Sequence, residues 1–155
     1  MRSLDDIDKR ILDALQSDGR LTNLELADRV GLSPSPCLRR VRALEESGVI
    51  DGYGVRINRR AVGLNVMAFV LVRIERHGEV DARTFRQALK ALPEVVACYI
   101  TSGEFDLLLH VVVADLDEYR KFSLDRLLRV PFIRDIRTTF VIDTVVDARP
   151  LPVAP

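Results

Sequence analysis

The sequence predicts an α+β protein made of two small domains, a helical one followed by one that mixes strands and helices. Two observations support this prediction. Apolar residues recur at helical spacing through residues 4–44, and runs of β-branched and aromatic residues typical of strands begin at residue 67. We therefore divide the chain into a helical domain (1–57), a linker (58–66), an α+β domain (67–149) and a flexible tail (150–155).

The first two helices carry start signals of the capping-box type. We expect the first helix to begin at Ser3, with Asp6 as its capping-box partner. The second is expected to open at Thr22, with Glu25 as the partner. Gly31 follows the last apolar residue of the second helix and can take the left-handed conformation that ends it.

The turn before the third helix is very short, since only Gly31-Leu32-Ser33 separates the two helices. We expect Ser33 to cap the third helix and Pro34 to occupy its first turn. Its apolar face is predicted to hold Cys37, Leu38, Val41 and Leu44. Residues Ile50–Val55 then predict a tight ribbon, a small wing. Two capped helices joined by a short glycine turn are typical of a helix-turn-helix, so the first domain is predicted to be winged-helix-like.

The second domain alternates strand-like and helix-like segments. Strands are predicted at Met67–Ile74, Val95–Thr101, Phe105–Val113 and Ile133–Val146. One helix is expected to be capped by Asp81, and another to be capped by Asp115 or Asp117 and broken by Pro131. The order β-α-β-β-α-β is that of a ferredoxin-like fold. Because one sheet face would lack helices while the strands are apolar on both faces, we expect a second copy to cover that face in a homodimer.

The third helix has an outward face that suits double-stranded DNA. In a helix-turn-helix, the N-terminal residues of the second helix of the motif meet base edges in the major groove. We expect Arg39 to form a bidentate contact to guanine, and Arg40 and Arg42 to contact phosphates. The full set of candidate DNA-binding residues is Ser33, Ser35, Pro36, Arg39, Arg40 and Arg42. The alternative is that these arginines are simply the solvated side of an amphipathic helix.

The charge distribution favours a nucleic-acid partner, although the chain is neutral overall. Residues 36–60 carry six Arg and three Asp/Glu, a net charge of +3. With 48% apolar and 30% charged residues, the composition is that of a folded globular protein rather than a disordered one. No apolar run is long enough to span a bilayer and the first residues lack the pattern of a signal peptide, so we expect a cytoplasmic protein.

The sequence offers little support for metal or cofactor chemistry. Cys37 and Cys98 lie far apart and form no CxxC pair, and His77 and His110 are the two histidines. A structural zinc site needs about four ligands at close spacing. We therefore expect no metal and no cofactor, and two reduced cysteines that are at least partly buried.

The segment Ser102-Gly103-Glu104-Phe105-Asp106 is the most unusual loop of the second domain. Gly103 permits a tight hairpin whose N–H groups can hold a carboxylate, and Asp106 can accept a hydrogen bond from an ammonium group. A zwitterionic amino acid presents both groups, so this loop is a candidate effector site. The alternative is an ordinary hairpin turn, in which glycine and acidic residues are common.

Over about residues 4–147 the sequence resembles the family of leucine-responsive and asparagine-operon regulators (Lrp/AsnC). The most specific match runs from Gly31 to Val41, because its Ser-Pro-x-Pro-Cys helix start is unusual elsewhere. The segment 102–106 corresponds to the Gly-x-x-Asp loop of the family, and Arg137-Thr138-Thr139 corresponds to its last strand.

The resemblance implies a sequence-specific DNA-binding transcriptional regulator with a second domain of the RAM type. It further implies homodimers that assemble into tetramers or octamers, and an amino-acid effector such as leucine or another apolar amino acid. The effector-binding residues that it implies are Thr101, Ser102, Gly103, Glu104, Asp106 and Thr138.

Two other functions are compatible with the sequence. Some proteins of this two-domain architecture resemble sirohaem decarboxylases, in which histidines and a basic pocket serve a tetrapyrrole, and His77 and His110 are the candidates here. The arginines on the third helix argue against this enzyme, since a decarboxylase has no need for them. The other function is architectural: a protein that compacts DNA with low sequence specificity and without responding to an effector.

Overall fold

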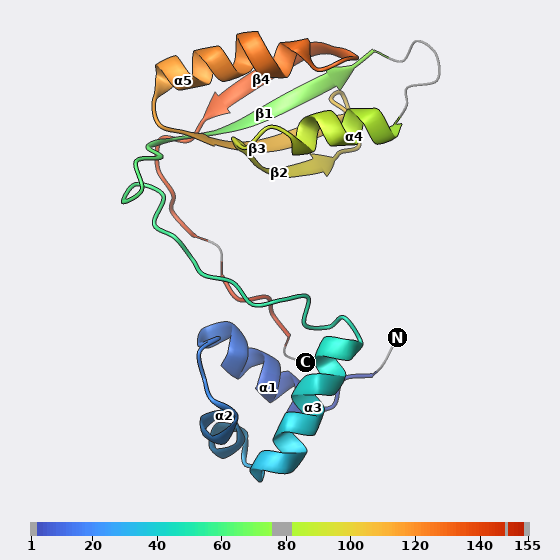
Figure 1. The fold of residues 1–155 in the computed structure, drawn as a ribbon, viewed down its shortest axis with the longest axis vertical. Coiled ribbons are helices and arrows are strands. Elements are labelled where there is room, and N and C mark those ends of the chain that lie inside the picture. Colours follow the sequence, from blue (N-terminus) through green and yellow to red (C-terminus); the bar gives the residue numbers. More distant parts are fainter. Residues whose placement is uncertain (1–2, 76–81, 148, 154–155) are drawn as a thin grey trace. The chain divides into compact units, whose positions relative to one another are not determined.

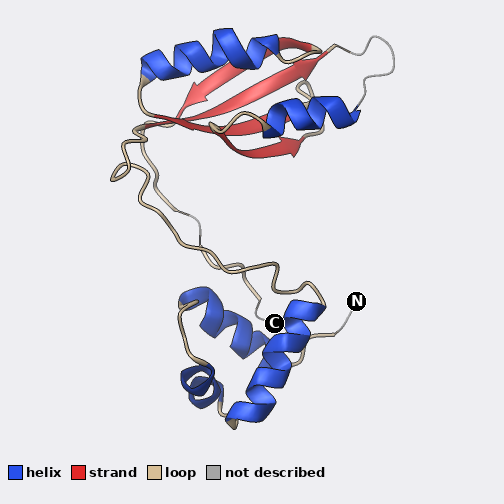
Figure 2. Cartoon of the chain, viewed as in Figure 1, coloured by secondary structure: helices blue, strands red, loops and turns tan. Residues whose placement is uncertain are grey.

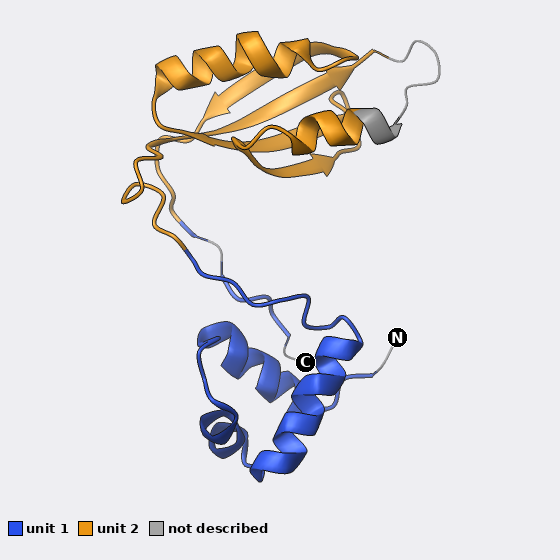
Figure 3. Cartoon of the chain, viewed as in Figure 1, with its two compact units in different colours: residues 1–56, 146–155 blue, residues 57–145 orange. Residues whose placement is uncertain are grey.

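The computed structural model describes residues 3–75, 82–147 and 149–153, with its helices and strands labelled in Figure 1. Helices alone occupy the first part of the chain, and strands mixed with helices follow (Figure 2). The chain forms two compact units: residues 1–56 together with 146–155, and residues 57–145 (Figure 3). Asp81, expected as a helix cap, and His77 lie outside the described residues.

The helical unit contains α1 (Asp6–Ser17), α2 (Asn23–Val30) and α3 (Pro34–Glu46). Their apolar faces meet in one core, whose buried members are Ile11, Leu12, Ala14, Leu26, Ala27, Val30, Cys37 and Leu44. Three short amphipathic helices are marginal in isolation, so burial of this shared face supplies most of their stability.

The caps of the first two helices follow the sequence signals only in part. Helix α1 is capped by Asp5 rather than Ser3, because one carboxylate oxygen of Asp5 accepts from the backbone N–H groups of Ile7 (3.0 Å) and Asp8 (2.8 Å). A carboxylate beside the partly positive helix start is a better acceptor than a hydroxyl two residues outside it. The capping box of Thr22 and Glu25 is confirmed.

The short turn and the start of α3 are confirmed, with Gly31 in the left-handed region at φ 72°. Ser33 occupies the N-cap position, although its side chain makes no capping hydrogen bond. The placement of Leu38 in the apolar face was wrong, since its side chain is 39% exposed. At about 100° per residue the buried face is centred near Cys37 and Leu44, and Leu38 lies about 110° from that centre.

The ribbon predicted at Ile50–Val55 was wrong, because these residues contain no strand. The chain after α3 continues without a helix or strand, and the Tyr53 hydroxyl donates a hydrogen bond to Glu45 Oε1 (2.9 Å). A two-stranded ribbon of a few residues is marginally stable in water, and here Val55 is 88% exposed and has no core to join.

Residues 150–153, expected to belong to a flexible tail, return to the helical unit. The Leu151 N–H donates to Gln16 Oε1 (2.6 Å), and Gln16 Nε2 donates to the Leu151 carbonyl (3.1 Å). The side chain of Val153 packs against the helical core. The last part of the chain is therefore part of the same compact unit as α1.

The second unit contains the strands β1 (Val66–Ile74), β2 (Val95–Ile100), β3 (Leu107–Val113) and β4 (Ile133–Phe140), and the helices α4 (Ala82–Lys90) and α5 (Leu116–Lys121). The predicted β-α-β-β-α-β order is confirmed, and the strands form one antiparallel sheet in the order β2-β3-β1-β4. Asp115 caps α5, which continues through a π turn (Phe122–Arg126) and a 3₁₀ turn (Leu127–Arg129).

Strand β4 ends at Phe140 and not at Val146 as predicted. It is an edge strand whose one neighbour is β1, and Phe140 pairs with Ala68 near the start of β1. Because Val141 already bonds to Met67, one residue from the start of β1, almost none of β1 remains for the segment after Val141 to pair with.

The two faces of the sheet differ in their cover. One packs on α4 and α5 around the core residues Ala68, Val70, Val72, Phe85, Leu89, Leu107, Leu109, Val111, Tyr119, Phe122 and Leu127. The register places Phe69, Tyr99 and Leu108 on the other, helix-free face, where Phe69 is 37% and Tyr99 56% exposed. This helix-free face therefore leaves large apolar side chains exposed.

Candidate DNA-binding face and effector pocket

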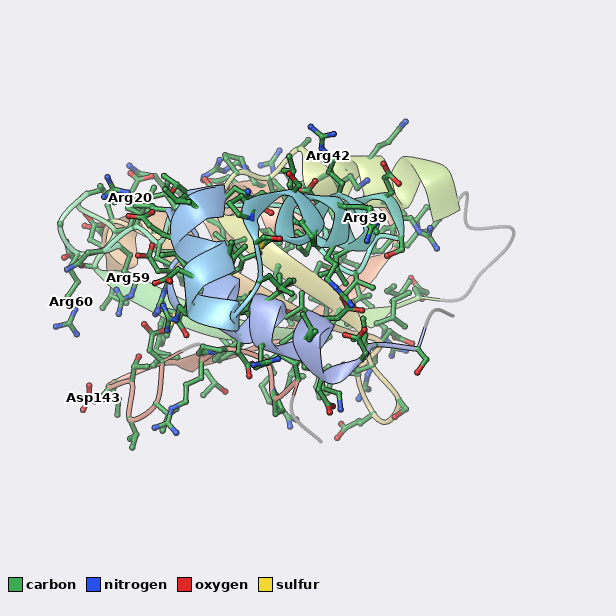
Figure 4. All side chains as sticks on the ribbon, turned by 90° about the horizontal axis from the view of Figure 1, so that it is seen from below. Arg20, Arg39, Arg42, Arg59, Arg60 and Asp143 are labelled. Carbon is green, nitrogen blue, oxygen red and sulfur yellow. The ribbon has the colours of Figure 1, made fainter. Side chains whose placement is uncertain are left out.

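The exposed side of α3 presents two arginines without ionic partners. Arg39 and Arg42 both extend from this helix, as Figure 4 shows, and neither guanidinium forms an ion pair with any residue that the structure describes. With Ser35 they line a shallow depression of about 330 Å³, which also includes Leu38 and Glu46. Free cations and a hydroxyl along one helix face are suited to phosphate and base-edge contacts.

The N-terminal end of α3 is also accessible. Ser33 and Ser35 are exposed and Pro36 is half-buried. The structure therefore brings five of the six predicted DNA-binding residues to the first turns and the outer side of one helix. These five are Ser33, Ser35, Pro36, Arg39 and Arg42.

The sixth, Arg40, has partners within the protein. Its Nη1 atom lies 2.7 Å from Asp5 Oδ2 and 2.8 Å from Asp8 Oδ1. The side chain of Asp8 is only 1% exposed, so this ion pair connects α3 to the start of α1 inside the helical unit. The backbone N–H of Asp8 and then the Arg40 guanidinium lower the pKa of the Asp5 carboxyl below its ordinary value. These ion pairs give Arg40 a structural role within the helical unit.

The loop 102–106 folds onto the end of the sheet. Gly103 has a φ of 127°, a backbone conformation that would be strained in any residue with a side chain. The ring of Phe105 is buried, and the guanidinium groups of Arg73 and Arg137 lie 5.1 Å and 5.0 Å from its centroid. Glu104 forms an ion pair with Arg73 at 2.7 Å. These two cation–π contacts help to hold the loop in place.

Asp106 is hydrogen-bonded to the ends of neighbouring strands through both its backbone and its carboxylate. Its Oδ2 atom accepts from the Ile74 N–H (2.8 Å), and its N–H donates to the Val72 carbonyl (2.9 Å). The Thr101 N–H donates to the Asp106 carbonyl at 3.0 Å. These hydrogen bonds hold Asp106 beside a cavity that it helps to line.

That cavity, of about 680 Å³, lies between α4 and β2. Its walls are mostly apolar and include Ile74, Phe85, Leu89, Val95, Cys98, Ile100 and Leu107. Thr101 and Asp106 line one part of it, and the cationic residues Arg86 and Lys90 line another. Sequence reasoning missed the contribution of α4, for which the basic residues on an amphipathic helix were the available signal.

The remaining predicted effector residues are not among those that line this cavity. Ser102, Gly103 and Glu104 belong to the neighbouring loop, whereas Thr138 lies on the face of β4 that α5 covers. The Thr138 hydroxyl is hydrogen-bonded to that of Tyr119. Its neighbour Arg137 contacts the loop instead, through the ring of Phe105.

His110 lies on the helix-free face of the sheet, stacked on Phe69 with ring centroids 5.2 Å apart. Its Nε2 atom is buried and has no hydrogen-bond partner among the described residues. Burial lowers the pKa of His110, and the charge of Arg59 lowers it further. Cys37 is buried, whereas Cys98 is exposed, so the expectation that both cysteines are at least partly buried was wrong for Cys98.

A helical unit with a free basic recognition helix, joined to a ferredoxin-like unit with a ligand-sized cavity, defines a two-domain DNA-binding regulator of transcription. Residues 4–51 match the family model of winged helix-turn-helix DNA-binding domains, and residues 67–151 match that of the Lrp/AsnC ligand binding domain. The chain belongs to the Lrp/AsnC family of transcriptional regulators, and it is not an enzyme.

Similar proteins carry the same assignment. The leucine-responsive regulatory protein of Escherichia coli is 42% identical over 144 residues, which cover 93% of this chain and 88% of that protein. A transcriptional regulator from Neisseria meningitidis, solved as a complex with L-Met, is 39% identical with a TM-score of 0.91 over 97% of each chain. The leucine response regulatory protein of Mycobacterium tuberculosis is 36% identical with a TM-score of 0.78, covering 93% of this chain and 96% of that one.

None of the helices in the described part of the chain is long and apolar enough to cross a membrane. Among the same residues, no three His, Cys, Asp or Glu side chains cluster as a metal site would require.

Proposed function

We propose that α3 reads operator DNA mainly through Arg39 and Arg42, with Ser33, Ser35 and Pro36 at the edge of the groove. The protein would act in the cytoplasm. The observation that carries this proposal is the pair of arginines with no ionic partner among the described residues, on the exposed side of the recognition helix. Arg39 lies nearly opposite the buried face of α3 and is suited to a guanine edge. Arg42, one turn later, is suited to a phosphate.

Substituting Arg39 tests the DNA part of the proposal. Arg39→Ala is expected to weaken specific DNA binding by about 1–3 kcal/mol, because a bidentate base contact contributes about that much discrimination. The affinity is measured by gel shift on a duplex that the wild-type protein selects from a random library. The control is Arg29→Ala, which removes an exposed arginine from α2. Unchanged affinity of Arg39→Ala, with native circular dichroism, would contradict the assignment.

We propose that the effector is an apolar amino acid bound in the cavity between α4 and β2. The cavity falls within the size range of small-molecule sites and offers mostly apolar walls for a side chain. Arg86 and Lys90 are placed to receive the carboxylate, and Thr101 and Asp106 to receive the ammonium group. The Gly-x-x-Asp loop would then act by holding Asp106 at the cavity.

A thermal-shift screen of the twenty amino acids tests the effector, because a ligand that binds only the folded state raises the melting temperature by mass action. Apolar amino acids are expected to give the largest shifts. Calorimetry then compares the wild type with Lys90→Gln, and with Lys121→Gln as the matched control, since Lys121 lies on α5 paired with Glu118. A loss of affinity confined to Lys90→Gln supports the cavity. Equal affinities in all three proteins would count against it.

We propose that the helix-free face of the sheet joins two copies in a homodimer, and that dimers assemble further into tetramers or octamers. The exposed Phe69 and Tyr99 side chains support the first step. A dimer also suits DNA, because two recognition helices bind two half-sites and gain affinity from their linkage. Analytical ultracentrifugation of Phe69→Glu tests this step, and an unchanged sedimentation profile would count against it.

A further inference from the structure

Leu38 on α3 is exposed, although large apolar side chains on a helix usually belong to the core. The side chain of Leu38 is 39% exposed, whereas the adjacent Cys37 and the more distant Leu44 are fully buried. The structure describes every residue of α3, and Leu38 is the large apolar side chain on this helix that is left exposed.

The neighbours of Leu38 belong to the DNA-facing side of the helix. Residues three and four apart are adjacent on a helix surface, so Ser35 and Arg42 flank Leu38 directly. The three side chains line the same shallow depression, together with Arg39. A side chain in that position points toward the groove that Arg39 and Arg42 would enter.

The chemistry of Leu38 limits what it can recognise there. A leucine side chain donates and accepts no hydrogen bonds, so it cannot read the polar edges of bases. In the major groove the apolar feature is the C5-methyl group of thymine, which apolar side chains contact. Burying one methyl group contributes about 0.8 kcal/mol, which corresponds to an affinity change of about fourfold.

We infer that Leu38 is a specificity-determining residue that contacts a thymine methyl group next to the position read by Arg39. This inference rests on the proposed placement of α3 in the major groove. It goes beyond that placement by assigning an A·T base pair to a residue with no polar function.

The test combines one protein substitution with one change in the DNA. The probe is the duplex selected by the wild-type protein from a random library, with each thymine replaced in turn by uracil, which lacks the methyl group. For the wild type, one uracil position on each half-site is expected to lower affinity about fourfold. Leu38→Ala is expected to bind the thymine and uracil probes equally, at the wild-type affinity for uracil.

Two controls separate this effect from folding and from surface burial in general. Alanine is the strongest helix former, so the circular dichroism of Leu38→Ala should match that of the wild type. Val49→Ala removes a side chain of similar exposure, 40%, that lies beyond the end of α3, and it should keep the full thymine preference.

Three outcomes would overturn the inference. If Leu38→Ala keeps the same thymine preference as the wild type, another residue reads the methyl group. If no uracil position affects the wild type, no methyl group is read, although DNA recognition by α3 stands. If no sequence is selected at all, the proposed recognition by α3 fails as well.

Discussion

The ion pair of Arg40 with Asp8 should stabilise the helical unit without contributing to DNA affinity. The perturbation is Arg40→Met, which keeps most of the apolar stem and removes the charge. The substitution removes two ion pairs that differ in burial. The Asp8 side chain is 1% exposed, whereas the Asp5 side chain is 54% exposed, so solvent screens the pair with Asp5. A hydrogen bond to a buried charged group contributes about 1.5–3 kcal/mol, so we expect a loss of about 2 kcal/mol.

Urea unfolding followed by hydrogen–deuterium exchange of α1 and α3 peptides measures this loss in the helical unit separately. The matched control is Arg42→Met, which removes a solvent-exposed cation from the same helix and should leave stability unchanged. The salt dependence of DNA binding should show the reverse pattern. Arg42→Met should reduce the slope of log affinity against log salt by about 0.9, and Arg40→Met should not. A stable Arg40→Met protein with a reduced slope would refute the structural role and restore the phosphate contact.

Two further predictions follow from the same structure. Truncation after Val145 removes the hydrogen bonds between Gln16 and Leu151 and the packing of Val153. It should lower the free energy of unfolding of the helical unit by about 1–2 kcal/mol. Identical hydrogen–deuterium exchange rates in α1 with and without these residues would contradict this. Because the pKa of His110 is lowered in the folded state, the unfolded chain binds a proton more readily. Stability should therefore be complete above the ordinary histidine pKa of 6.5 and fall as the pH decreases below it. Melting temperatures between about pH 8 and pH 5 should show this fall in the wild type and a smaller one in His110→Gln, and parallel curves would count against the histidine.

Features encoded by neighbouring residues were predictable from the sequence. The capping box of Thr22 and Glu25 and the left-handed glycine at position 31 are local, because each involves residues within one or two helical turns. The order of strands and helices in the second unit was likewise readable from the periodicity of apolar residues.

Features that depend on distant partners were not predictable in this way. The length of β4 is limited by β1, and the wing at residues 50–55 is absent because nothing pairs with it. The side chain of Phe105, with no special role in the sequence pattern, turned out to contact Arg73 and Arg137 from two different strands.

The sequence by itself determined the order of the helices and of the sheet strands, which motif opens the chain, and which family it resembles, because these depend on spacing along the chain. Only the tertiary structure decided which arginines of α3 are free. Arg40 and Arg42 are two residues apart, yet the packing of α3 on α1 places the first against Asp8 and leaves the second in solvent. The same packing left Leu38 exposed, and it also took helix packing to bring Arg86 and Asp106 to one cavity. Such contacts arise from the angles at which elements meet, and these angles have no signature in local sequence spacing.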